Sequence, residues 1–133
     1  MRFLVDASAF YPLAFIEGGE YVLVDSYIMD LTVYEIGNII WKRTRRGLVD
    51  FSEVIASMED LFGLVEILRI DHLDLREIET MAVKQGLTFY DSAYLYYSER
   101  KDLILVTEDQ ELAEKAGSRA MGVEEALEDA LKS

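Results

Sequence analysis

The sequence predicts an α/β fold, a three-layer α/β/α sandwich with a central parallel sheet. Short apolar segments alternate with longer segments whose apolar residues recur at helical spacing, as in parallel sheets joined by helical crossovers. Several of the short segments are apolar throughout, which is typical of strands buried on both faces. With 133 residues, of which 51% are hydrophobic, the chain has the size of one domain, residues 1–133, with a full core.

The N-terminal part of the chain predicts a strand followed by a helix. Phe3–Val5 is short, wholly apolar and followed directly by Asp6, as expected of a buried strand. Ser8 is expected to cap a helix that extends to Ile16, and Gly18-Gly19 is expected to end it.

A second strand and a long helix are expected next. Residues 27–31 form an apolar stretch interrupted by Asp30, which is compatible with a short strand. Thr32 is expected to cap a helix that ends at Arg46, with Glu35 as its reciprocal partner in a capping box.

The rest of the chain continues the alternation of helices and strands. The expected elements, in order, are a helix from Ser52 to Phe62, a strand at 65–70, a helix at 73–85, a helix from Asp91, a strand at 103–106, a helix at 110–116, a strand at 120–121 and a helix from Val123. No linker, repeat or low-complexity segment interrupts this order.

Composition excludes several classes of protein. The 13 basic and 26 acidic residues give a net charge of −13, which excludes a broadly basic nucleic-acid surface but not a local basic patch. The absence of cysteine excludes disulfides, thiolate metal sites and thiol nucleophiles. His72, the one histidine, has no nucleophile motif beside it and is expected to be a surface or capping residue. The N-terminus lacks a signal-peptide core and no apolar run could span a membrane, so we expect a soluble, cytoplasmic protein.

Four acidic residues lie in or beside apolar segments: Asp6, Glu35, Asp91 and Asp109. A carboxylate in such surroundings costs free energy unless something pairs with it, and a divalent cation is a common partner. Asp6 and Asp109 follow predicted strands, so both are expected at the carboxyl-end edge of the sheet. Taken singly, each acid also has a structural explanation: a helix cap for Asp6 and Asp91, the capping box for Glu35, and a favourable helix dipole for Asp109.

The helix that carries Glu35 ends in a basic run, Lys42, Arg43, Thr44, Arg45 and Arg46. Thr32, Glu35 and Asn38 lie on roughly the same stripe of this helix as part of that run. A catalytic pocket needs such a stripe if acidic residues form the pocket and basic residues next to it bind the phosphates of the substrate. Basic residues also favour helix C-termini through the dipole, which explains the run equally well.

The segments VDAS, EIGN, TFYDSAYL and LVTEDQEL resemble, in order and spacing, the PIN-domain ribonucleases, particularly the VapC-type toxins of toxin–antitoxin pairs. The resemblance covers nearly the whole chain. It implies a PIN-like fold and an acidic quartet of Asp6, Glu35, Asp91 and Asp109, with Ser8, Asn38 and Thr107 supporting these acids. It also implies a homodimer, an RNA substrate and a cognate antitoxin.

The expected chemistry is phosphodiester hydrolysis by a water that Mg²⁺ or Mn²⁺ activates. Asp6, Asp91 and Asp109 are the expected direct or water-bridged ligands, and Glu35 is expected to bind a second ion or orient the water. Lys42, Arg43, Arg45 and Arg46 are the expected substrate contacts, while a role for Glu108 or Glu111 stays open. The alternatives are a receiver-like Mg²⁺-binding signalling domain and a PIN-type subunit that only binds.

Overall fold

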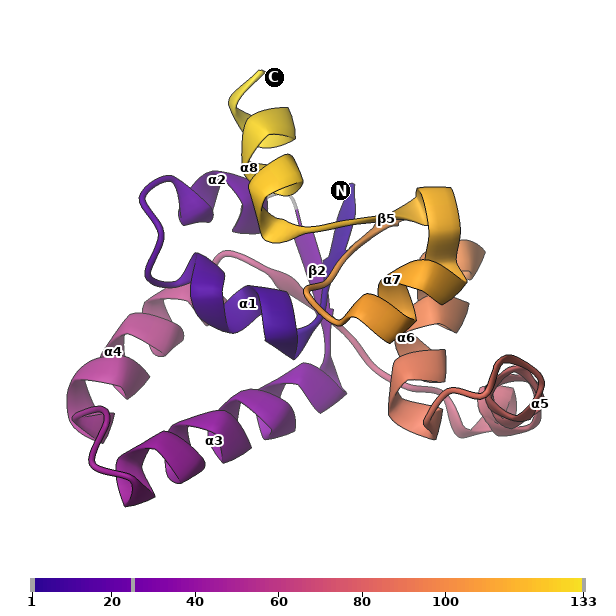
Figure 1. Ribbon diagram of the computed structural model, residues 1–133, viewed down its shortest axis with the longest axis horizontal. Coiled ribbons are helices and arrows are strands. Elements are labelled where there is room, and N and C mark those ends of the chain that lie inside the picture. Colours follow the sequence, from indigo (N-terminus) through magenta and orange to yellow (C-terminus); the bar gives the residue numbers. More distant parts are fainter. Residues whose placement is uncertain (1, 25, 133) are drawn as a thin grey trace.

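The computed structural model describes residues 2–24 and 26–132, and it has a central sheet with helices on both faces (Figure 1). The five parallel strands are β1 (Phe3–Val5), β2 (Ser26–Met29), β3 (Glu66–Leu68), β4 (Ile104–Val106) and β5 (Ala120–Met121), in the order β3-β2-β1-β4-β5. The predicted α/β/α sandwich is therefore confirmed. Receiver domains have the strand order 2-1-3-4-5, so the receiver-like alternative is wrong.

The helices form two groups, one on each face of the sheet (Figure 1). The first group comprises α1 (Ala7–Leu13), α2 (Gly19–Leu23), α3 (Asp30–Arg45), α4 (Phe51–Phe62) and α8 (Val123–Leu131). The second comprises α5 (Leu75–Gln85), α6 (Phe89–Arg100) and α7 (Gln110–Ala116), with 3₁₀ turns at His72–Asp74 and Gly117–Arg119. Within the described residues, none of the helices is both long enough and apolar enough to cross a membrane.

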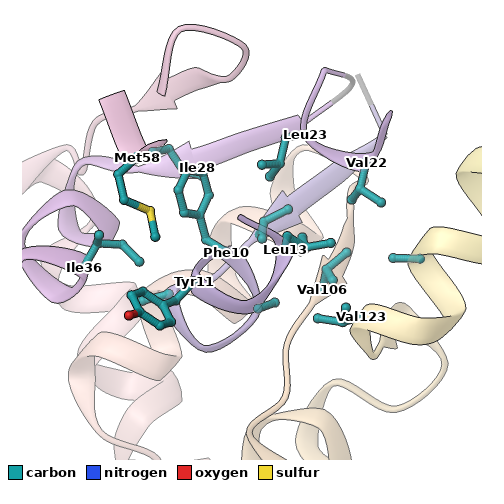
Figure 2. Packing of buried hydrophobic residues seen from close by; sticks show 14 of the residues in the cluster. Phe10, Tyr11, Leu13, Val22, Leu23, Ile28, Ile36, Met58, Val106 and Val123 are labelled. Carbon is teal, nitrogen blue, oxygen red and sulfur yellow. The ribbon is translucent and has the colours of Figure 1, made fainter. Parts of the chain in front are cut away.

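Alternation along the strands divides the core into two clusters. Phe3 and Val5 belong to the cluster under α1, α3, α4 and α8, whereas Leu4 belongs to the one under α5, α6 and α7. Successive side chains of a strand point to opposite faces, so a wholly apolar strand supplies both clusters. Figure 2 shows part of the first cluster, to which Met58 of α4 and Phe10 of α1 both contribute.

The helix boundaries near the N-terminus differ from the prediction. Asp6, not Ser8, caps α1, which ends at Leu13 and not at Ile16. Gly19 begins α2 and so does more than end a helix. A Cβ atom at Gly19 would lie 2.0 Å from the carbonyl oxygen of Leu13, which explains the glycine through close packing of the chain.

Other helices also begin earlier than predicted. Asp30 opens α3, so β2 ends before it, and the cap is Met29 in place of Thr32. Asp50 caps α4, in place of Ser52, and Thr88 caps α6, which therefore starts before Asp91. The remaining boundaries lie close to those expected, and the predicted bounds of β1, α7 and β5 are confirmed.

Candidate active site

The site lies where β1 and β4 end side by side. Val5 pairs with Val106, so the next residues, Asp6 and Thr107, leave the sheet as neighbours. The chain runs from β1 outward to β2 and β3, then returns to place β4 on the other side of β1. In open α/β sheets, such a reversal leaves a crevice at the carboxyl ends of the strands, where ligands bind.

Hydrogen bonds from two segments hold the buried Asp6 carboxylate. Its Oδ1 accepts from the Ser8 hydroxyl at 2.6 Å and from the Ala9 amide at 3.1 Å. Its Oδ2 accepts from the Thr107 hydroxyl at 2.5 Å, and the hydroxyl oxygens of Ser8 and Thr107 lie 3.3 Å apart. Asp6 therefore caps α1 and at the same time joins the ends of β1 and β4.

The surroundings of Asp6 make its carboxylate easier to protonate than an exposed one when no cation is bound. Burial raises its pKa from the ordinary 3.8 to about 6. The hydrogen bonds from Ser8, Thr107 and Ala9 oppose this rise because they stabilise the anion, while repulsion from Glu35 adds to it.

The second acid, Glu35, is not part of a capping box, so the expected pairing with Thr32 is wrong. The Thr32 hydroxyl accepts instead from the Met29 amide, at 3.0 Å. Glu35 Oε1 accepts a hydrogen bond of 2.6 Å from the Tyr94 hydroxyl. Burial raises the pKa of Glu35, and the bond from Tyr94 opposes that rise.

The third acid, Asp91, lies in the first turn of α6 and does not cap it. The Thr88 side chain has that role, because it accepts from the Asp91 amide at 3.1 Å. Burial, together with repulsion from Asp109, Glu35 and Glu111, raises the pKa of Asp91 from 3.8 to about 6. A hydrogen bond with the Thr88 side chain opposes this rise, and the half-buried carboxylate lies near three other acids.

Asp109 is the exposed N-cap of α7, and its Oδ1 accepts from the Leu112 amide at 2.9 Å. Of the two neighbouring acids left open, Glu111 repels Asp91, whereas a Glu108 carboxylate oxygen lies 3.1 Å from the position of a Cβ atom at Gly122. Glu108 is thus turned toward the start of α8.

The structure brings the four predicted acids together in one connected set. Asp6 is repelled by Glu35, and Asp91 by both Glu35 and Asp109. Among the described residues, none of the four forms an ion pair with a basic side chain. Oxygen donors that repel one another, without a neutralising base, match the preference of hard divalent cations.

The acids do not converge as tightly as a closed metal site would. Within residues 2–24 and 26–132, no three Asp, Glu or His side chains lie close enough together to hold an ion. Mg²⁺ usually keeps several waters and takes only one or two carboxylates directly. The donor set therefore fits an ion that some of these acids would reach through water.

The remaining predicted residues lie along α3. Asn38 lines an open hollow of about 390 Å³ together with Glu35, Leu31, Tyr34 and Tyr90. Lys42, Arg45 and Arg46 line a second hollow, of about 330 Å³, beside Trp41. The Arg43 guanidinium stacks on the Tyr11 ring with its carbon 4.9 Å from the ring centre, and Arg45 lies 5.0 Å from the Trp41 ring. Glu35 and the basic run thus share one helix, and Lys42 lies two turns, roughly 10 Å along the axis, after Glu35.

Sequence reasoning missed the role of Tyr94. Tyr94, Tyr96 and Tyr97 are buried, as core residues of α6 would be, but the Tyr94 hydroxyl also contacts an acid of the site. The available signal is its spacing, because residues three apart share a helix face and Tyr94 is three residues after Asp91. His72 is exposed on the surface, as expected.

The chain is similar over most of its length to two curated proteins of Pyrobaculum aerophilum. It is 39% identical over 120 residues to "Exonuclease VapC9", covering 86% of each chain. It is 33% identical over 124 residues to "Ribonuclease VapC3", covering 86% of this chain and 95% of the relative. The crystal structure of PAE2754 from the same organism aligns with a TM-score of 0.89 at 36% identity, over 100% of this chain and 98% of that one. No protein-family model matches the chain.

Proposed function

The chain belongs to the VapC family of PIN-domain nucleases, and from this premise we propose that it is a Mg²⁺- or Mn²⁺-dependent endoribonuclease. The observation that carries the proposal is a set of mutually repelling acids, in which Asp6 and Asp109 follow β1 and β4 while Glu35 and Asp91 lie on α3 and α6. A divalent cation bound among these carboxylates would offset their mutual repulsion. The chain would act as a single catalytic domain, residues 1–133.

Each acid would have a definite task in hydrolysis. When bound, the ion would polarise the phosphodiester and supply hydroxide near neutral pH. Asp6, Asp91 and Asp109 would hold it directly or through water, with Ser8 and Thr107 keeping the Asp6 carboxylate in place. Glu35 offers its second oxygen to the attacking water, because its first accepts from Tyr94.

The RNA would approach along α3. Lys42, Arg43, Arg45 and Arg46 are exposed and would contact phosphates next to the scissile one. Asn38 lines the hollow beside Glu35 and would donate to the nucleotide that enters it. A strongly acidic chain needs such a local basic segment, since its net charge of −13 otherwise repels a polyanion.

Exonuclease action is the second candidate, since VapC9 is called an exonuclease and VapC3 a ribonuclease. Circular and end-labelled linear RNA of the same sequence distinguish the two, because a circle has no ends. We expect Mn²⁺ to permit cleavage of both substrates and EDTA to abolish it. Degradation of the linear RNA alone would favour the exonuclease.

Asp6→Asn is the test variant, because asparagine keeps the helix cap but removes the charge. Asp50→Asn is its matched control, since Asp50 caps α4 in the same way, by accepting from the Ser52 amide. We expect only Asp6→Asn to lose cleavage. Equal activity in both variants would show that Asp6 is not part of the active site. No cleavage by the wild type with either metal would favour a subunit that only binds.

The proposed cellular role is that of the toxin in a toxin–antitoxin pair, acting in the cytoplasm as a homodimer. An antitoxin arginine could pair with the repelling acids and block the site. Expression of the wild type, but not of Asp6→Asn, should arrest growth, and co-expression of the product of a neighbouring short reading frame should relieve the arrest. Light scattering of the purified chain tests the dimer.

A further inference from the structure

A chain of hydroxyl groups connects β2, α3 and α6 behind the acidic site. The Met29 amide donates to the Thr32 hydroxyl oxygen at 3.0 Å. The hydroxyl oxygens of Thr32 and Tyr94 lie 2.7 Å apart, and Tyr94 in turn donates to Glu35 Oε1 at 2.6 Å. Thr32 and Glu35 are three residues apart on α3, and the Tyr94 hydroxyl lies between them.

Counting protons sets the direction of every bond in this chain. A tyrosine hydroxyl carries one proton, and Tyr94 uses it in the hydrogen bond that it donates to the Glu35 carboxylate. The proton between Thr32 and Tyr94 must therefore come from Thr32, whose oxygen accepts from Met29. Burial and the neighbouring Glu35 raise the pKa of Tyr94, so this hydroxyl keeps its proton to donate. All three groups donate toward the acid.

Among the described residues, Tyr94 is the one hydrogen-bond partner of the Glu35 side chain. The Tyr94 side chain is 1% exposed and packed in the core, so its hydroxyl has a fixed position. A glutamate on an open helix face would otherwise sample several rotamers. The contact selects one of them and leaves Oε2 unengaged beside the hollow that Asn38 lines.

We propose that Tyr94 is a positioning residue, which with Thr32 holds the Glu35 carboxylate in its working orientation at the acidic site. The proposal deepens the nuclease function proposed above and rests on it. It assigns a functional reason to a core tyrosine and to the threonine three residues before the acid. Tyr94 itself does not touch the reacting atoms.

A double-mutant cycle in the metal-free protein tests the contact without any activity measurement. Tyr94→Phe, Glu35→Ala and the double variant are unfolded in urea. If Tyr94 acts through Glu35, the two changes are not additive, because either one removes the same contact. Additive midpoint shifts would overturn the proposal. Tyr97→Phe combined with Glu35→Ala is the additive control, since the Tyr97 hydroxyl donates to Asp74 at 2.8 Å and not to the site.

Cleavage kinetics test the consequence for catalysis. Tyr94→Phe should lower kcat by about 10- to 100-fold with little change in KM, as for other groups that orient an active-site ligand. Tyr97→Phe, which removes a hydroxyl from another buried ring of the same helix, should keep wild-type kcat. Equal kcat in Tyr94→Phe and wild type would overturn the proposal.

Thr32 supplies a second pair of variants in case Tyr94→Phe folds poorly. Thr32→Val removes the hydroxyl that donates to Tyr94, and Thr32→Ser retains it. We expect the serine variant to keep kcat and the valine variant to lower it; the same kcat in both would overturn the proposal. An inactive wild type would defeat the nuclease proposal instead, and the urea cycle would then decide the role of Tyr94 alone.

Discussion

Thr107 and Asp6 are 101 positions apart in the chain, yet the Thr107 hydroxyl donates to Oδ2 of Asp6 at 2.5 Å. The same hydroxyl oxygen accepts from the Asp109 amide at 3.0 Å. One threonine therefore ties the buried acid after β1 to the loop that carries the exposed acid after β4. The Thr107 hydroxyl therefore links the two segments of the site that follow β1 and β4.

Replacement of Thr107 by valine should destabilise the protein by about 1–3 kcal/mol, because it leaves a buried carboxylate oxygen and an amide without their partner. It should also raise the pKa of Asp6 further, since the hydrogen bond from Thr107 lowers it. Urea unfolding near neutral pH measures the loss. Thr107→Ser keeps the hydroxyl and should retain most of the stability; an equal loss in both variants would assign the effect to the methyl group.

The stability of the metal-free protein should fall as pH rises from about 4 to about 7. The folded protein holds the Asp6 proton more tightly than the unfolded chain, because burial raises the pKa of this acid from 3.8 to about 6. This stabilisation is complete at pH values below the pKa of Asp6 in the unfolded chain. It is lost as pH rises through the pKa of Asp6 in the folded protein. For Asp6 the loss is roughly 3 kcal/mol. Asp91 adds less in the same direction, since water screens its half-buried charge.

The variant Asp6→Asn separates the contribution of Asp6 to the pH dependence of stability from that of the general charge repulsion in a chain with a net charge of −13. Urea unfolding in EDTA at several pH values should show a smaller pH dependence for Asp6→Asn than for the wild type. An identical slope in the two proteins would show that burial does not raise the pKa of Asp6 to about 6.

Mg²⁺ or Mn²⁺ should raise the melting temperature of the wild type, since an ion that binds only the folded state stabilises it by about 2.7 kcal/mol at 100 times its Kd. EDTA should reverse the shift. The double variant Asp6→Asn/Asp91→Asn should show no shift, while Asp50→Asn should behave as the wild type. A shift of equal size in the double variant would place the ion elsewhere.

Loss of basic charge on α3 should weaken RNA binding in a salt-dependent manner. Lys42→Gln/Arg46→Gln should raise KM and reduce the slope of log affinity against log salt by about 0.7 for each lost phosphate contact. Lys84→Gln/Lys115→Gln removes the same charge from the exposed sides of α5 and α7. If both double variants weaken binding equally, net charge and not a local contact governs the affinity.

The fold was predictable from the sequence because β1 and β4 are wholly apolar and the short strands alternate with helical patterns. The helix starts were less predictable, since Asp6, Asp50 and Thr88 compete as caps with the polar residues that follow them. Choosing between two adjacent cap candidates needs the backbone dihedrals, which pattern alone does not supply.

The acids of the site were predictable as unusual residues, and strand order explains why Asp6 and Asp109 lie at one edge. The prediction that Glu35 and Asp91 belong to the same site rested on the family resemblance. Spacing places Tyr94 on the same helix face as Asp91, but the contact with Glu35 was not predictable, because tyrosines at helical spacing are typical of a core. Only the packing of α6 against α3 distinguishes its hydroxyl from that of Tyr97.

The hydrogen bonds that hold the acids also restrict how a cation could use them. Asp6 has both oxygens engaged, and Glu35 and Asp109 each have one oxygen engaged. Carboxylates held in this way would favour coordination through a single oxygen over bidentate coordination. Ca²⁺ takes six to eight oxygen ligands and commonly a bidentate carboxylate, whereas Mg²⁺ retains much of its own water. The helix caps and the tyrosine contact would thereby select a small, hydrated ion over a large one.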